Sequence, residues 1–132
     1  MGCSFEFDPV NNILRYCWEG PVTDEVLLEG DTVGRGLLAA RPPCRGILDF
    51  SKATTVDISS QTIRTIACRP PAYGLGQVVV LVAPTDLLYG LSRMFVLLEE
   101  ERRPRMSVVR TMKEAYDLLR VDVPHFSPIS IP

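Results

Sequence analysis

Acidic and hydroxyl side chains suited to binding an anion or a partner are concentrated between residues 49 and 60. Asp49 ends a short apolar run, and Asp57, Ser59 and Ser60 precede apolar residues at helical spacing. Short polar side chains at a helix start accept hydrogen bonds from its first N–H groups, and the helix dipole there favours an anion. The candidate contact residues are Asp49, Ser51, Asp57, Ser59 and Ser60.

A purely structural role for the same residues remains open. Asp and Ser are preferred at the start of any helix, because they cap its free N–H groups. Asp49 stands where α/β proteins usually place their ligands, yet its carboxylate can equally bond to the backbone of the segment that follows. The residue types alone therefore allow either a contact site or ordinary capping.

Little else in the chain is suited to catalysis. A Ser or Cys nucleophile needs a base, and the only histidine, His125, lies in a proline-rich segment. The cysteines and acidic residues lack metal-ligand spacing, and the Gly-x-Gly segments at 34–36 and 74–76 lack the spacing of phosphate loops. We therefore expect no enzymatic activity, no catalytic residue, no metal site and no cofactor.

The hydrophobic pattern predicts one α/β domain. Alternation indicates a hairpin of strands at 3–8 and 13–18 that ends at Gly20-Pro21, and apolar runs indicate further strands. The further strands are expected at 45–50, 77–83 and 106–110, and the helices at 23–40, 58–67, 86–103 and 111–119. The order β-β-α-β-α-β-α-β-α predicts a mixed sheet of about five strands, with parallel inner strands and the hairpin at one edge. The domain is expected to span residues 1–120, followed by a proline-rich tail without regular structure at 121–132.

The first predicted helix, at 23–40, contains Gly30, Gly34 and Gly36. Each costs about 1 kcal/mol relative to Ala in a helix interior. Two interpretations follow: either the helix breaks near Gly30, or the glycines face something that must approach closely.

Two short motifs resemble a known family. Asp49-Phe50-Ser51, followed by the segment 56–60 (VDISS), resembles the signature of STAS domains, the anti-sigma-factor antagonist or SpoIIAA-like family. The segment 89–95 (YGLSRMF) is similar to one in small bacterial STAS-like proteins, whose fold is also similar to Sec14-type lipid-binding domains. The resemblance implies a regulatory module that contacts a kinase or another regulatory protein, with Ser59 at the position that is phosphorylated in the family. The Sec14 similarity implies the alternative of a small apolar ligand or a lipid.

The predicted helix at 86–103 carries more apolar residues than one core contact requires. Its core face is expected to hold Leu87, Leu88, Leu91, Met94, Phe95 and Leu98. Tyr89, Val96 and Leu97 remain on the flanks, where a second copy of the chain or an apolar ligand would cover them, unless the helix is simply broadly buried. Arg93 on the same helix would pair with an Asp or bind an anion. We therefore expect a homodimer or ligand face formed by Tyr89, Arg93, Val96 and Leu97.

Composition restricts the partners and the compartment. The 132 residues include 14 basic and 16 acidic side chains, and a net charge of -2 does not favour nucleic acid. The apolar stretch 78–98 is interrupted by Pro84, Asp86 and Arg93, so no stable membrane insertion is expected. Four scattered cysteines and the lack of a secretory signal favour a cytoplasmic protein.

Overall fold

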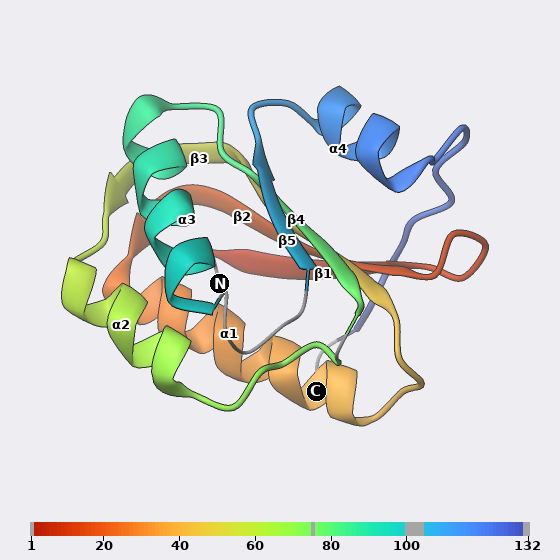
Figure 1. Cartoon of the computed structure of the whole chain (residues 1–132), viewed down its shortest axis with the longest axis horizontal. Helices are drawn as coiled ribbons and strands as arrows, with labels where there is room; N and C mark the ends of the chain where they lie inside the picture. The colour runs from red at the N-terminus through yellow and green to blue at the C-terminus, as the bar shows by residue number, and fades with distance from the viewer. Residues whose placement is uncertain (1, 75, 100–104, 131–132) are drawn as a thin grey trace.

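The computed structural model describes residues 2–74, 76–99 and 105–130. In chain order the elements are β1 (Cys3–Asp8), β2 (Ile13–Thr23), α1 (Asp24–Ala39), β3 (Arg45–Asp57), α2 (Ser60–Cys68), β4 (Val78–Val82), α3 (Asp86–Glu99), β5 (Arg105–Val109), α4 (Met112–Leu119) and β6 (Ser127–Pro128). Figure 1 shows their arrangement. No helix among these residues is long and apolar enough to cross a membrane.

The described strands form one sheet in the order β5-β4-β3-β2-β1-β6. The inner pairs β2–β3, β3–β4 and β4–β5 are parallel, and β1 is antiparallel to both of its neighbours. The predicted α/β domain with parallel inner strands is therefore confirmed. The sixth strand, β6, was not predicted: it lies in the proline-rich tail, where Ser127 and Pro128 pair with Phe7 and Glu6 on the outer edge of β1.

Helices cover both faces of the sheet (Figure 1). Helices α1, α2 and α3 enclose a main core on one face, whereas α4 encloses a smaller core on the other. Strand β4 contributes to both, because Val79 and Leu81 point into the main core and Val80 and Val82 into the smaller one. This is the placement expected of a strand that is apolar on both faces.

Helix α1 is unbroken, and two of its glycines lie against aromatic rings. Thr23 caps the helix by accepting a hydrogen bond from the Val26 N–H at 3.3 Å. A Cβ atom on Gly30 would lie 2.9 Å from the Trp18 ring, and one on Gly34 would overlap Tyr16. The close-approach interpretation is therefore confirmed at Gly30 and Gly34, although nothing lies near Gly36.

Two predicted strand ends were wrong. Strand β2 continues past Gly20 with register shifts, one of them next to Gly20, which has a φ of 72°. Strand β3 was predicted to end at Phe50 but continues to Asp57, so the polar residues after Phe50 are extended strand. The two extensions pair with each other from Lys52 to Asp57, and this backbone pairing outweighs the turn preferences of the polar side chains.

Candidate functional site

Four of the five predicted contact residues are exposed on one continuous segment. Ser51 and Asp57 lie on β3, and Ser59 and Ser60 lie at the start of α2. Beyond Asp49, β3 pairs with β2 alone among the described strands, because its pairing with β4 covers only residues 46–49. We call the exposed residues of this segment the β3–α2 strip: Ser51, Lys52, Thr54, Thr55, Asp57, Ser59 and Ser60.

Asp49 does not belong to the strip. Its side chain is buried, with a relative exposure of 1 %, on the face of the sheet that α4 covers. Its carboxylate accepts hydrogen bonds from the Arg15 guanidinium, with the Nε atom at 3.2 Å, and from the Ser51 N–H at 2.8 Å. The structure shows the alternative of a bond to the following backbone, and the predicted partner contact at Asp49 stays a prediction.

Arg15 connects Asp49 to a second carboxylate. Its Nη1 atom lies 3.0 Å from Glu6 Oε1, and Cys17 donates its thiol proton to the same oxygen at 3.5 Å. Burial raises the pKa of Cys17 to about 12, and neighbouring Arg15 only partly offsets this, so the thiol is neutral at physiological pH. The described residues include no group of three or more His, Cys, Asp or Glu placed to hold a metal ion.

The sequence pattern did not reveal this cluster, because its members come from three strands and meet only through sheet register. Glu6 pairs with Arg15 between β1 and β2, and Asp49 pairs with Cys17 between β2 and β3. The one available signal was the alternation of Arg15 and Cys17 with the buried aromatic residues of β2.

Ser59 joins the starts of two helices. Its hydroxyl accepts the Thr62 N–H at 3.2 Å, which makes it the N-cap of α2 as its position predicted. Its own N–H donates to Asp24 Oδ1 at 2.8 Å, and Asp24 lies in the first turn of α1. This bond is the main reason that the pKa of Asp24 is lowered. The two residues are 35 positions apart in the chain, so their contact could be found only from the fold.

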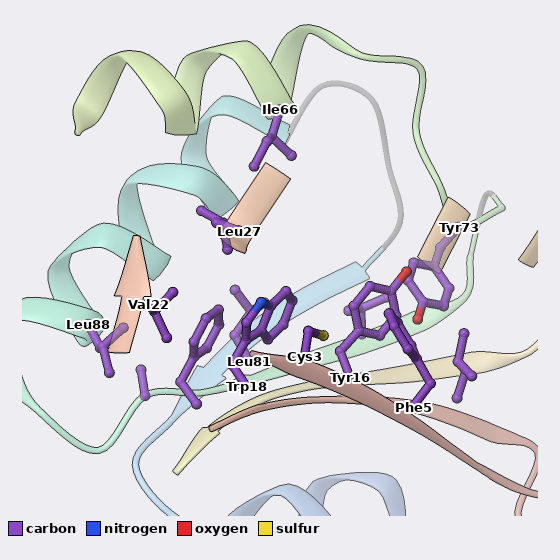
Figure 2. Close-up of a cluster of buried hydrophobic side chains, with 14 of the residues drawn as sticks. Cys3, Phe5, Tyr16, Trp18, Val22, Leu27, Ile66, Tyr73, Leu81 and Leu88 are labelled. Atoms are coloured by element: carbon purple, nitrogen blue, oxygen red, sulfur yellow. The ribbon is translucent and has the colours of Figure 1, made fainter. Parts of the chain in front are cut away.

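A cavity of about 80 Å³ lies between the sheet and helices α1, α2 and α3. In Figure 2, Tyr16 and Trp18 rise from the sheet toward the helices, from which Leu27 and Ile66 point back. The lining is largely apolar. Two polar atoms of lining residues, Trp18 Nε1 and the Tyr73 hydroxyl oxygen, are buried without a hydrogen-bond partner among the described residues.

Helix α3 is rotated relative to the predicted core face. Ser92 and Glu99 are buried beside Leu88, whereas Leu87 and Leu98, predicted to face the core, are 56 % and 44 % exposed. The apolar periodicity did not predict this face, because the inward-facing Ser92 and Glu99 are polar and do not contribute to it.

The residues predicted for a dimer or ligand face therefore differ in their exposure to solvent. Tyr89 and Val96 are half-buried against the main core, while Leu97 is 59 % exposed and Arg93 is exposed. The Arg110 guanidinium lies over the Tyr89 ring, with its central carbon 4.2 Å from the ring centroid. Arg110 also forms an ion pair with Asp86.

The fold and these sites define a single-domain α/β protein with a six-stranded mixed sheet among its described residues. Comparison with known proteins found no matching family model, no matching curated protein and no matching solved structure. The STAS-like resemblance therefore stays a prediction that rests on the two sequence motifs.

Proposed function

We propose that this chain is a noncatalytic, STAS-like interaction module whose protein partner binds the β3–α2 strip. The observation that carries the proposal is the one-sided pairing of β3 beyond Asp49. An unpaired strand edge offers N–H and C=O groups to an extended segment of another chain, and the exposed side chains beside it provide specificity.

The chemistry of the strip favours a polar partner segment. Its side chains are hydroxyl-bearing or charged, and Lys52 makes only a long, exposed ion pair with Glu19 at 3.5 Å. Such a pair adds little stability and is readily exchanged for a contact with a partner. A kinase or another regulatory protein fits this surface, as the family resemblance implies.

A site-specific crosslink tests the proposal. A photo-crosslinking residue at Thr54, introduced in the native host, should yield a discrete adduct, which Ser60→Arg on the same strip should abolish. The matched control places the crosslinker at Asp122, which is exposed outside the strip. Equal adducts from positions 54 and 122, or an adduct that Ser60→Arg does not change, would contradict the assignment of the strip.

The predicted alternative, a small apolar ligand or a lipid, needs a pocket of sufficient volume. Ligand pockets typically enclose on the order of 300 Å³ or more, whereas the cavity beneath α1, α2 and α3 encloses about 80 Å³. This small volume supports a small apolar ligand more than an acyl chain.

A further inference from the structure

We propose that the outer edge of β5 binds an extended, acidic segment of a partner protein, which adds to the sheet as a further strand. This contact lies at the opposite end of the inner strands from the β3–α2 strip. The strip begins beyond the row of paired residues that contains Asp49, Val82 and Val109. The new contact begins at the row of Val78 and Arg105, so it is independent of the partner site proposed above.

The backbone of β5 is open on one side. β5 is the terminal strand of the described sheet and pairs with β4 alone. The Arg105 N–H and the Val109 C=O form hydrogen bonds with the residues that flank β4, at 2.9 and 2.8 Å. Backbone groups point to alternate sides along a strand, so those of Met106 and Val108 point outward. Neither of these two residues has an outward partner among the described hydrogen bonds.

A groove of about 500 Å³ lies beside this edge, between β5 and the end of α4. Its described lining residues are Val78, Arg105, Met106, Ser107, Leu118 and Arg120. The volume is within the usual range for binding sites, roughly 300–1,000 Å³. The groove therefore has room for side chains of a bound strand, and Leu118, which is 48 % exposed, provides them with an apolar contact.

The two arginines of the groove have no acidic partner among the described residues. Neither Arg105 nor Arg120 forms an ion pair there, and the lining includes no Asp or Glu. Of the carboxylates nearest to Arg120 in the chain, Asp117 pairs with Lys113 at 3.1 Å, and Asp122 forms no ion pair within the described ranges. A guanidinium group binds a carboxylate through two parallel hydrogen bonds. The unpaired arginines therefore favour acidic side chains in the bound segment.

A third arginine adds positive charge next to the groove. The Arg45 guanidinium donates to the Leu119 carbonyl oxygen at 2.7 Å, and Leu119 directly precedes Arg120 in the chain. Its second described hydrogen bond, at 2.6 Å, is to the Asn11 carbonyl oxygen, so no described carboxylate neutralises it. Three positive charges without acidic partners attract an acidic segment over about 8 Å at physiological salt.

Alternation along β5 defines the sequence of the segment. Arg105 and Ser107 lie on the face of the sheet that α4 covers, whereas Met106 and Val108 lie on the face of the main core. Side chains of an added strand alternate between the same two faces. Acidic residues at every second position therefore meet the arginines, and apolar residues between them pack beside Met106 and Val108. A free anion would use the arginines but leave the strand edge open, so the combination favours a peptide.

Fluorescence anisotropy with labelled peptides tests both the charge and the strand addition. The probe is a heptapeptide in which glutamate alternates with valine. Two matched peptides carry glutamine in place of glutamate, or a methyl group on every backbone nitrogen. The probe should bind saturably, and each matched peptide should bind about tenfold or more weakly, because each loses several hydrogen bonds. No saturable binding, or equal binding of the glutamine peptide, would overturn the proposal. Equal binding of the methylated peptide would show a site for an anion only and would overturn the added strand.

Variants locate the binding in the groove. Arg105→Gln and Arg120→Gln, both at exposed positions, should each weaken binding of the probe by about fivefold or more. The matched control Arg64→Gln removes the same charge from an exposed position of α2 and should leave binding unchanged. Ser60→Arg, which should disrupt the contact on the β3–α2 strip, should also leave it unchanged, so the two proposals can fail separately. Undiminished binding in both groove variants, or lost binding in Ser60→Arg, would contradict the site.

Hydrogen exchange followed by NMR tests the strand edge itself. The bound probe should slow the exchange of the Met106 and Val108 N–H groups. The Ser107 N–H, which points toward β4, is the internal control and should change little. Unchanged exchange at Met106 and Val108 would contradict strand addition. Slow exchange of these groups without peptide, which increases with protein concentration, would show that a second copy occupies the edge and would equally overturn the proposal.

Discussion

At the scale of single residues, buried carboxylates tie together segments that lie far apart in the chain. Asp8 is completely buried and accepts hydrogen bonds from the Asn11 backbone and side chain at 2.8 and 2.7 Å, and from the His125 N–H at 2.8 Å. Asp49 connects β2 and β3 through Arg15. Each carboxylate is paired or fully hydrogen-bonded, as buried charge requires.

Replacing Asp8 with Asn should destabilise the fold in a pH-dependent manner. Burial raises the pKa of Asp8, but the bonds from Asn11, His125 and Val10 outweigh it, so the folded-state pKa lies below the ordinary value. A lowered pKa stabilises the fold above the unfolded-state pKa of about 3.9, and this stabilisation is lost as the pH falls through the folded-state value. Urea unfolding should show Asp8→Asn less stable by about 1–3 kcal/mol at pH 7, with the difference shrinking below about pH 4.

The exposed Asp122→Asn provides the control for that measurement, since it removes one carboxylate from an open position. Its stability should match the unmodified chain at both pH values. A constant difference between Asp8→Asn and the unmodified chain from pH 7 to pH 3 would show that the charge on Asp8 is not what the bonds stabilise.

A phosphate on Ser59 should push the starts of α1 and α2 apart. Ser59 is exposed, but its N–H is held by the Asp24 carboxylate, which carries a lowered pKa and stays ionised at neutral pH. The N-terminal end of the helix dipole favours a phosphate at Ser59, but the Asp24 carboxylate repels it. The mimic Ser59→Asp should lower the melting temperature at low salt, and adding Asp24→Asn should restore most of the loss.

The control Ser60→Asp places the charge one residue further along α2, where no bond to Asp24 is present in the described hydrogen bonds. It should have a smaller effect. For phosphorylation itself, mass spectrometry of protein from its own host is decisive, and an unmodified Ser59 under several growth conditions would remove support for it.

At the scale of elements, the helix starts and the parallel inner strands could be predicted, but their contacts could not. Thr23, Ser59 and Thr111 cap helices at or next to the predicted starts, because capping depends on local backbone geometry alone. The extension of β3 depends on its partner β2, and the rotation of α3 depends on a cavity that accepts Ser92. Such features arise between segments, so no pattern within one segment contains them.

The glycines of α1 provide a matched pair of substitutions. Gly34→Ala should destabilise the fold by about 1–3 kcal/mol, because the new methyl group overlaps the buried Tyr16 ring. Gly36→Ala faces open space and should stabilise the fold by about 0.5–1 kcal/mol through helix propensity. Chemical denaturation of both variants measures the contrast, and similar effects at the two positions would refute the packing explanation.

At the scale of the whole molecule, the remaining question is what covers the outer surface of α3. Leu87, Leu97 and Leu98 are exposed there, whereas Tyr89 and Val96 are shared with the chain's own core. Exposed apolar residues that are grouped on one helix are typical of a contact between proteins. The homodimer expected from the sequence therefore stays a prediction, with Leu97 as its central residue.

Replacing Leu97 with Glu should split that dimer and leave the fold intact. A charge at a self-complementary apolar contact is buried without a partner on both copies. Sedimentation velocity at micromolar concentration should give a dimer for the unmodified chain and a monomer for Leu97→Glu, with similar circular dichroism. Arg64→Glu, on an exposed position of α2, is the control. A monomeric unmodified chain would show that the exposed leucines do not mediate association.

The pairing of β6 with β1 also sets the order in which this protein can be completed during synthesis. The His125 N–H that satisfies Asp8 lies 117 positions later in the chain. Ribosomes add roughly 5–20 residues per second, so Asp8 and the outer edge of β1 emerge on the order of ten seconds before their partners. During that interval the first strand of the sheet has a free edge and a carboxylate lacking one of its donors. A nascent chain stalled before residue 125 should therefore expose the outer edge of β1 to chaperones, and synthesis of residues 125–128 is the step that closes this edge.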